Sequence, residues 1–110
     1  MMNILITPFN DYAIVHLEGR LDTSNAGEFE KQLLTVIEEG SARIIIDCTG
    51  LDYISSSGLR VFLIVLKKIK VLKGVFSLCS LKPGIKEIFD ISGFSTIFSV
   101  FPDKEAALKN

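Results

Sequence analysis

Short apolar runs, many of them rich in β-branched residues, occur along the whole chain and predict the strands of a sheet. The runs at residues 4–6 and 12–17 flank an Asn-Asp turn and predict two neighbouring strands. The run at residues 43–47 is uninterrupted, which is typical of a strand covered on both faces. Two later runs, at residues 75–79 and 96–100, predict the last two strands.

Apolar residues between these strands recur every three or four positions and predict helices. The first helix follows the N-cap candidates Asp22, Thr23 and Ser24 and continues to about Glu39. The second helix is expected over the apolar stripe at residues 59–69, and the third over the stripe at residues 85–91 with Pro83 in its first turn. A short final helix is expected over residues 102–108. Glycines are expected to end three elements: the second strand at Gly19, the first helix at Gly40 and the second helix at Gly74. The apolar stripe of the third helix is expected in the core: Ile85, Ile88, Phe89 and Ile91. Phe94, Phe98 and Phe101 are expected either in the core or in an exposed docking patch.

The predicted order of elements is β-β-α-β-α-β-α-β-α. This order indicates a single α/β domain over residues 1–110, with a mixed, mostly parallel sheet and helices packed against it. Functional sites of such sheets gather at the carboxyl ends of strands. Both Asp47 and the three serines at residues 55–57 are expected at such an end.

Composition narrows the classes of function. The 110 residues carry a net charge of −1, so no bulk electrostatic attraction to nucleic acid or to an anionic membrane is expected. The longest apolar run, residues 61–66, is far too short to span a membrane, and no signal peptide is visible. Cys48 and Cys79 form neither a disulfide framework nor a metal site and are expected to be buried free thiols. We therefore expect a cytoplasmic protein without a cofactor.

The segment Ser55-Ser56-Ser57-Gly58 separates the central strand from an apolar helix and is the strongest functional signal. A helix N-terminus has unpaired backbone N–H groups and the positive end of the helix dipole. A serine there can cap the helix, and a kinase could phosphorylate one of the hydroxyl groups. Local chemistry leaves both interpretations open.

Three motifs in order resemble the STAS domain, in the form of a bacterial anti-sigma factor antagonist. The first is Gly19-Arg20-Leu21-Asp22, and the second is the strand Ile46-Asp47-Cys48 followed by Tyr53-Ile54-Ser55-Ser56-Ser57-Gly58-Leu59. The third is Ile88-Phe89-Asp90-Ile91-Ser92-Gly93-Phe94. The resemblance covers essentially the whole chain. The sequence departs from the common pattern at Ser55, where the family often has an aspartate.

The resemblance implies regulation by partner switching. Such a protein binds a serine kinase that also acts as an anti-sigma factor and holds ATP, is released when the kinase phosphorylates it, and is reset by a PP2C-type phosphatase. The phosphorylated residue of the family falls on Ser56. The residues expected to bind the partner are Asp22, Ser55, Ser56, Ser57, Gly58 and Leu59. Phosphate on Ser56 would act through added bulk and through repulsion of Asp22, without a large conformational change.

Three alternatives follow from the residues. A phospho-aspartate receiver domain would use Asp47 and the Lys82-Pro83 pair, but the first strand lacks the acidic pair that such a site needs for Mg²⁺. A serine hydrolase is disfavoured because the one histidine, His16, lies within a strand and no Gly-x-Ser-x-Gly motif is present, so we expect no enzyme. The third alternative is a constitutive STAS scaffold in a larger signalling assembly, in which the serines only cap a helix.

Overall fold

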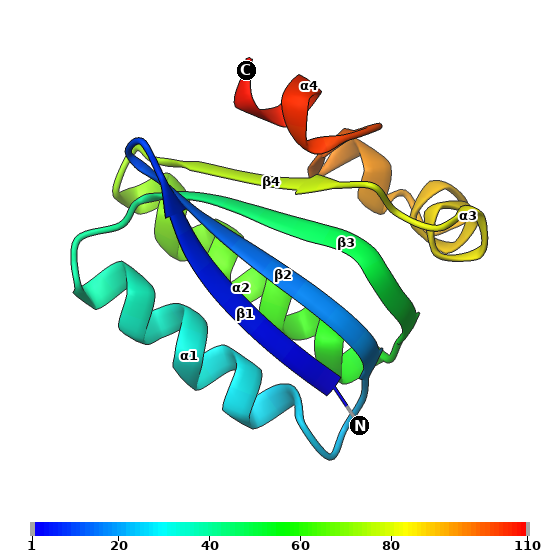
Figure 1. Ribbon diagram of the computed structural model, residues 1–110. Helices are drawn as coiled ribbons and strands as arrows, with labels where there is room; N and C mark the ends of the chain where they lie inside the picture. The colour runs from blue at the N-terminus through cyan, green and yellow to red at the C-terminus, as the bar shows by residue number, and fades with distance from the viewer. Residues whose placement is uncertain (1, 110) are drawn as a thin grey trace.

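A computed structural model describes residues 2–109 and contains one five-stranded sheet in the order β1-β2-β3-β4-β5 (Figure 1). Strands β1 and β2 form an antiparallel hairpin, and the other neighbours are parallel. This mixed α/β sheet confirms the expected fold class. The strands are β1 (Met2–Phe9), β2 (Tyr12–Leu21), β3 (Arg43–Ile54), β4 (Val75–Cys79) and β5 (Ser99–Phe101). The helices are α1 (Ala26–Glu38), α2 (Ser56–Val71), α3 (Pro83–Ile91), the 3₁₀ turn η1 (Phe94–Thr96) and α4 (Lys104–Leu108).

The central parallel pair is longer than the sequence pattern predicts. Strand β2 does not end at Gly19. This residue adopts a φ of 103° where the register between β2 and β3 shifts, and the strand then continues to Leu21. Strand β3 continues to Ile54, which pairs with Leu21. Asp47 consequently lies in the middle of β3, and the prediction that it lies at a strand end is wrong. The serines do follow the end of this strand.

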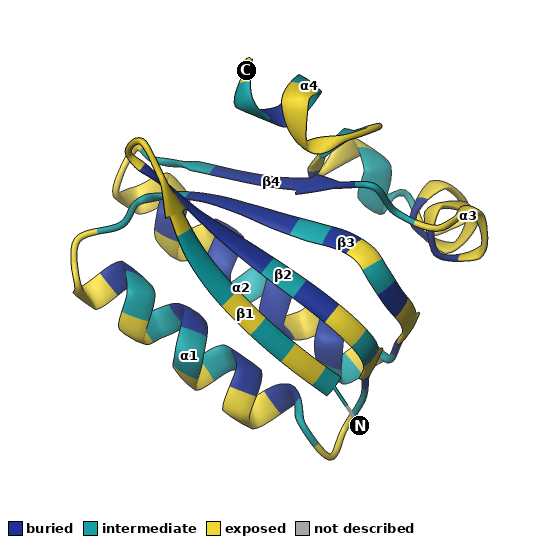
Figure 2. Ribbon diagram, in the orientation of Figure 1, coloured by how far each residue is buried: buried dark blue, intermediate teal, exposed yellow. Residues whose placement is uncertain are grey.

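The main core lies between one face of the sheet and helices α1, α2 and α3, and the inward faces of these helices are the buried ones in Figure 2. Apolar residues of β2 and β3 alternate with residues of the other face, as the two-residue period of a strand requires. Aromatic rings occupy the centre, and Phe62 makes edge contacts with Phe29 and Phe98 at centroid distances of 5.9 and 6.2 Å. Helix α2 is therefore held against both α1 and the C-terminal segment.

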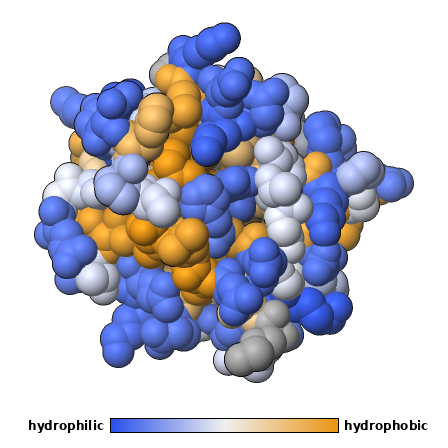
Figure 3. All heavy atoms as spheres, in the orientation of Figure 1, coloured by the Kyte–Doolittle hydropathy of each residue, from blue (hydrophilic) through white to orange (hydrophobic). Residues whose placement is uncertain are grey.

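The opposite face of the sheet is only partly covered. Helix α4 buries Ala107 there in a small cluster with Ile45 and Cys79. The part over β1 and β2 remains open and includes Leu5, which is 61% exposed and pairs with His16 of the neighbouring strand. Figure 3, drawn in the same orientation as Figure 1, shows hydrophobic patches on this side separated by hydrophilic groups. Within residues 2–109, no helix has the length and apolar character needed to cross a membrane.

The C-terminal segment differs from the expected strand at residues 96–100. Residues 94–96 form the 3₁₀ turn η1 after Gly93, which adopts a φ of 79°, and only Ser99–Phe101 pair with β4. The turn allows Phe94 and Phe98 to pack against each other, with ring centroids 6.2 Å apart. Packing of rings into the core therefore overrides local strand propensity.

The apolar residues expected in this core are only partly buried. Phe89, Phe98 and Ile85 are buried as predicted, and Phe94 and Phe101 are half-buried. Ile88 and Ile91 were expected to be buried, but they are 45% and 78% exposed. Helix α3 has only nine residues and turns one narrow side to the core, so the rest of its apolar stripe faces away.

Candidate functional site

The N-terminus of α2 is built by the serine segment. Ser55 is the N-cap residue: its backbone is extended, and its Oγ accepts a hydrogen bond from the backbone N–H of Gly58 at 3.3 Å. The backbone N–H of Ser55 also donates to the carbonyl oxygen of Leu21 at 2.9 Å. The helix therefore begins immediately after the last pair of β2 and β3, and its start is fixed to the end of β2.

The three serine hydroxyl groups have different surroundings. The Ser55 Oγ caps the helix, and the Ser57 Oγ lies 3.2 Å from the Thr23 Oγ1 and shares a hydrogen bond with it. The Ser56 side chain is exposed in the first turn, and within residues 2–109 it makes no side-chain hydrogen bond. Of the three serine hydroxyl groups, that of Ser56 is thus the one without a structural role among residues 2–109.

Gly58 and Leu59 attach this helix start to the core. A side chain at Gly58 would place a Cβ atom 2.7 Å from the Cγ of Leu21 and 2.9 Å from the Cγ1 of Ile54. Such distances are far below van der Waals contact, so the backbone of α2 approaches the two strands more closely than any other residue would allow. Leu59 is half-buried and packs against the main core. These two residues position the serines.

Asp22 lies directly after β2 and organises the loop before α1. Its Oδ1 accepts hydrogen bonds from the Ser24 backbone N–H at 3.0 Å and from the Ser24 hydroxyl at 2.6 Å. Helix α1 begins one to three residues later than expected, because Asn25 is the N-cap residue and Asp22, Thr23 and Ser24 belong to the preceding turn. The Asn25 Oδ1 accepts from the Asp22 backbone N–H at 2.9 Å. The N-cap prediction was therefore wrong for all three candidates.

The charge of Asp22 is stabilised locally. The hydrogen bonds from the side chain and backbone of Ser24, assisted by the nearby Arg20 charge, lower the pKa of the Asp22 carboxyl group. A carboxylate is therefore present in the loop that contacts the start of α2 through the Thr23–Ser57 hydrogen bond. The structure thus brings the loop of Asp22 into contact with the serine segment through this hydrogen bond.

Two further features of this surface were missed by the sequence analysis. Arg20 stacks on the ring of Tyr53 with its guanidinium carbon 4.1 Å from the ring centroid, beside the last residues of the two strands. Thr23 contacts Ser57 across 34 positions of sequence. Tyr53 belongs to the motif that contains the serines, so its position next to them could have been predicted from the sequence. The contact of Thr23 with Ser57 could not, because it depends on how α1 and α2 pack.

Asp47 belongs to a different cluster, on the open face of the sheet. Its Oδ2 lies 3.0 Å from the His16 Nδ1, and the His16 Nε2 lies 3.3 Å from the Thr7 Oγ1. Its Oδ1 accepts from the backbone N–H and the hydroxyl of Thr49. Because Asp47 is hydrogen-bonded within a strand, the receiver-domain alternative loses the strand-end carboxylate on which it depended. Among residues 2–109, no three His, Cys, Asp or Glu residues are grouped to hold a metal ion.

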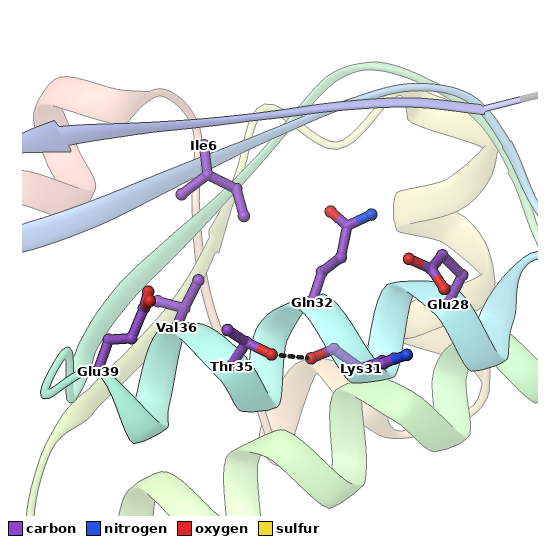
Figure 4. A pocket seen from close by; sticks show the side chains of 7 residues that line it. All are labelled: Ile6, Glu28, Lys31, Gln32, Thr35, Val36 and Glu39. Atoms are coloured by element: carbon purple, nitrogen blue, oxygen red, sulfur yellow. Dashed lines mark hydrogen bonds between the residues drawn. The ribbon is translucent and has the colours of Figure 1, made fainter.

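Two grooves of the surface differ in whether residues of the serine segment line them. One groove of about 360 Å³ lies between β1 and α1; in Figure 4, Ile6 points toward the helix, and Gln32 and Val36 point toward the strand. None of its lining residues belongs to the serine segment or to the Asp22 loop. A second cavity, of about 230 Å³, lies between the starts of α1 and α2 and is lined in part by Thr23 and Ser57. This second cavity is part of the candidate site.

Comparisons with known proteins agree with this geometry. The sequence model of the STAS domain matches residues 3–107. The chain is 40% identical over 106 residues to BtrV of Bordetella bronchiseptica, which carries the name of an anti-sigma factor antagonist, with 96% of this chain and 91% of that protein covered.

Solved structures share the fold at lower identity. An anti-sigma factor antagonist of Mycobacterium paratuberculosis has a TM-score of 0.91 at 18% identity, with 99% of this chain and 92% of that chain covered. The Bacillus cell fate determinant SpoIIAA in the phosphorylated form has a TM-score of 0.76 at 20% identity, with 97% of each chain covered. The chain therefore belongs to the STAS domain family, in the group named anti-sigma factor antagonists.

Proposed function

We propose that this antagonist works by partner switching controlled by phosphorylation of Ser56. The unphosphorylated protein binds a serine kinase that is itself the anti-sigma factor. The kinase transfers the γ-phosphoryl group of ATP to the Ser56 Oγ, with release of ADP and the hydroxyl proton, and the antagonist then dissociates. A PP2C-type phosphatase hydrolyses the phosphate ester and resets the protein. The antagonist itself performs no catalysis, and its cytoplasmic location follows from the need for ATP.

The observation that carries the proposal is the difference between the three serine hydroxyls. Ser55 and Ser57 are engaged by Gly58 and Thr23, whereas Ser56 is exposed at the first turn of α2. A helix start favours an anion, because its N–H groups and dipole are positive there. Phosphate at this position is thus compatible with the folded structure, so its effect falls on the partner surface.

The size of that effect is sufficient for a switch. A phosphate carries nearly two negative charges, and the Asp22 carboxylate lies in the loop that contacts the start of α2 through Thr23. Two negative charges on a phosphate and one on a carboxylate, separated by about 7 Å, repel each other by roughly 1–5 kcal/mol for effective dielectric constants of 80 to 20. A partner whose surface complements one carboxylate would then face three negative charges and a bulky phosphate group. A loss of about 3 kcal/mol corresponds to roughly a hundredfold lower affinity.

The relatives support the same proposal. BtrV, at 40% identity, bears the name of an anti-sigma factor antagonist, and SpoIIAA of the same fold has been solved in a phosphorylated form. We infer that the partner of this protein is an anti-sigma factor and that Asp22, Ser55, Ser56, Ser57, Gly58 and Leu59 form the surface that it contacts.

Mass spectrometry of the protein recovered from its native cells tests the proposal, with phosphatases inhibited and growth conditions varied. The expected result is a phosphate on Ser56 whose occupancy changes with conditions. A phosphate on Ser55 or Ser57 would contradict the assignment of the residue while keeping the switch. No phosphate under any condition would favour the constitutive scaffold, in which the serine segment only caps α2.

A further inference from the structure

Arg60 lies one helical turn after Ser56 in α2. Its side chain is exposed, and within residues 2–109 it makes no ion pair and no side-chain hydrogen bond. Side chains of an α-helix lean toward its N-terminus, so a residue covers the turn before its own Cα. Residue 60 is four positions after residue 56, so the side chain of Arg60 is long enough to reach back to the turn that contains Ser56.

The cavity between α1 and α2 gives this side chain a defined place. Arg60 and Ser57 line the wall formed by α2, and Thr23 and Glu30 line the wall formed by the first helix and its preceding loop. The hydroxyl groups of Ser57 and Thr23 are already paired with each other. Glu30 lines the cavity without an ion pair to Arg60, so the guanidinium is available to a stronger anion that arrives at the helix start.

We propose that Arg60 is the internal counter-ion of the phosphate on Ser56. The inference rests on the proposed function, because it concerns the phosphorylated state of the same residue. An anion four positions N-terminal to a cation is the favourable order for a helical ion pair. A guanidinium and a phosphate form charge-assisted hydrogen bonds, which are stronger than neutral ones.

The pairing changes what phosphorylation does to the surface. Before phosphorylation, Arg60 presents a positive charge beside Ser57 that forms no ion pair with any residue of the range 2–109. Afterwards that charge is drawn to the phosphate, so the partner meets a new anion and loses a cation at the same time. Arg60 is thus a positioning residue for the phosphate, and Glu30 is its competitor for the guanidinium.

The test uses the whole chain with phosphoserine inserted at position 56 during translation, so that no kinase is needed. Phosphorus NMR follows the second ionisation of the phosphate, which is near pH 6 in a free phosphoserine. The variants are Arg60→Gln, Glu30→Gln and the control Lys67→Gln. Lys67 is exposed on the same helix, eleven residues beyond Ser56, which is about 16 Å along the axis and beyond the screening length at physiological salt.

The expected result is a rise of about 0.4 pH unit in the titration midpoint for Arg60→Gln, the size that corresponds to one helical ion pair. Lys67→Gln leaves the midpoint unchanged, and Glu30→Gln lowers it because the competing carboxylate is gone. Equal midpoints for the unchanged protein and Arg60→Gln, or equal shifts for Arg60→Gln and Lys67→Gln, would overturn the inference. Because the phosphate is supplied during translation, either outcome is independent of whether a kinase modifies Ser56 in the cell.

Discussion

The Oγ of Ser57 and the Oγ1 of Thr23 lie 3.2 Å apart and join the start of α2 to the loop before α1. This hydrogen bond engages one serine, and the capping bond to Gly58 engages Ser55. The hydroxyl groups of Ser55 and Ser57 are thus hydrogen-bonded within the fold, and Ser56, which lies between them in the sequence, is exposed. The arrangement gives the outer two serines a structural role and is consistent with the regulatory role proposed for the middle one.

Substitution of Ser56 is expected to lock the proposed switch. Ser56→Ala should bind the kinase partner persistently in the presence of ATP, because no phosphate can be added. Ser56→Asp should bind about a hundredfold more weakly, in line with a penalty of about 3 kcal/mol. Calorimetric titration against the purified partner measures both affinities, with Ser99→Ala, at an exposed serine of β5 outside the proposed surface, as the control that still switches. Equal affinities for Ser56→Ala and Ser56→Asp would contradict the mechanism.

Removal of the helix cap at Ser55 is expected to destabilise the fold. Ser55→Ala deletes the acceptor for the Gly58 N–H and should lower the free energy of unfolding by about 0.5–2 kcal/mol. Urea unfolding followed by circular dichroism measures the change. Ser56→Ala is the matched control, since it removes the same atom one position later and should leave stability within about 0.5 kcal/mol. A larger loss for Ser56→Ala than for Ser55→Ala would show that the cap is assigned to the wrong residue.

The close approach at Gly58 is expected to exclude any side chain. Gly58→Ala forces a Cβ against Leu21 and Ile54 and should lower the free energy of unfolding by about 1–3 kcal/mol. Gly27→Ala is the control: an added Cβ there meets nothing within 4 Å, and alanine is the better helix former. Unfolding curves should therefore move in opposite directions for the two variants. A neutral effect of Gly58→Ala would mean that α2 can move away from the strands at no cost.

Ionisation of the Asp47 carboxyl group is expected to make the free energy of unfolding depend on pH in the acid range. Burial acts to raise its pKa, but the hydrogen bonds from Thr49 and His16 outweigh burial, so the pKa is lowered. The stabilising contribution is therefore fully present above the unfolded-state pKa of about 3.9 and is lost as pH falls through the lower folded-state pKa.

Asp47→Asn removes this contribution. At pH 7 the variant should be less stable by about 1 kcal/mol, and the difference from the unchanged protein should shrink as the pH falls through the folded-state pKa. Glu87→Gln, at an exposed position of α3, serves as the control. Unfolding measured from pH 2 to pH 7 checks the slope. A constant difference between Asp47→Asn and the unchanged protein over that range would show that the effect is not one of ionisation.

The two cysteine thiols are expected to be unreactive in the folded protein. Cys48 and Cys79 are both buried, as the sequence predicts. Burial raises the pKa of Cys79 to about 11 and that of Cys48 well above its usual value, so very little thiolate is present at pH 8. A thiol reagent such as iodoacetamide should label neither residue until denaturant is added. Labelling of the native protein at the rate of the unfolded chain would contradict the buried positions.

Much of the candidate site could be predicted from local chemistry. Three serines and a glycine between an apolar strand and an apolar helix indicate a capped helix start, and the structure confirms it. The N-cap of α1 could not be found in the same way, because Asp22, Thr23, Ser24 and Asn25 are all good caps. The choice of Asn25 depends on the end of β2, whose Arg20 carbonyl oxygen accepts from the Asn25 side chain at 2.8 Å.

The amino-acid sequence by itself determined the order of elements, the fold class and the buried faces of α1 and α2. The spacing of apolar residues can be read within each segment, and it defines the face that the segment must bury. Only the tertiary structure decided where β2 and β3 end, since the extra pairs up to Leu21 and Ile54 require the partner strand. It also decided that the Ser57 hydroxyl is engaged by Thr23 while Ser56 faces out. Contacts between residues 34 positions apart arise from packing of one element on another, and no local pattern specifies them.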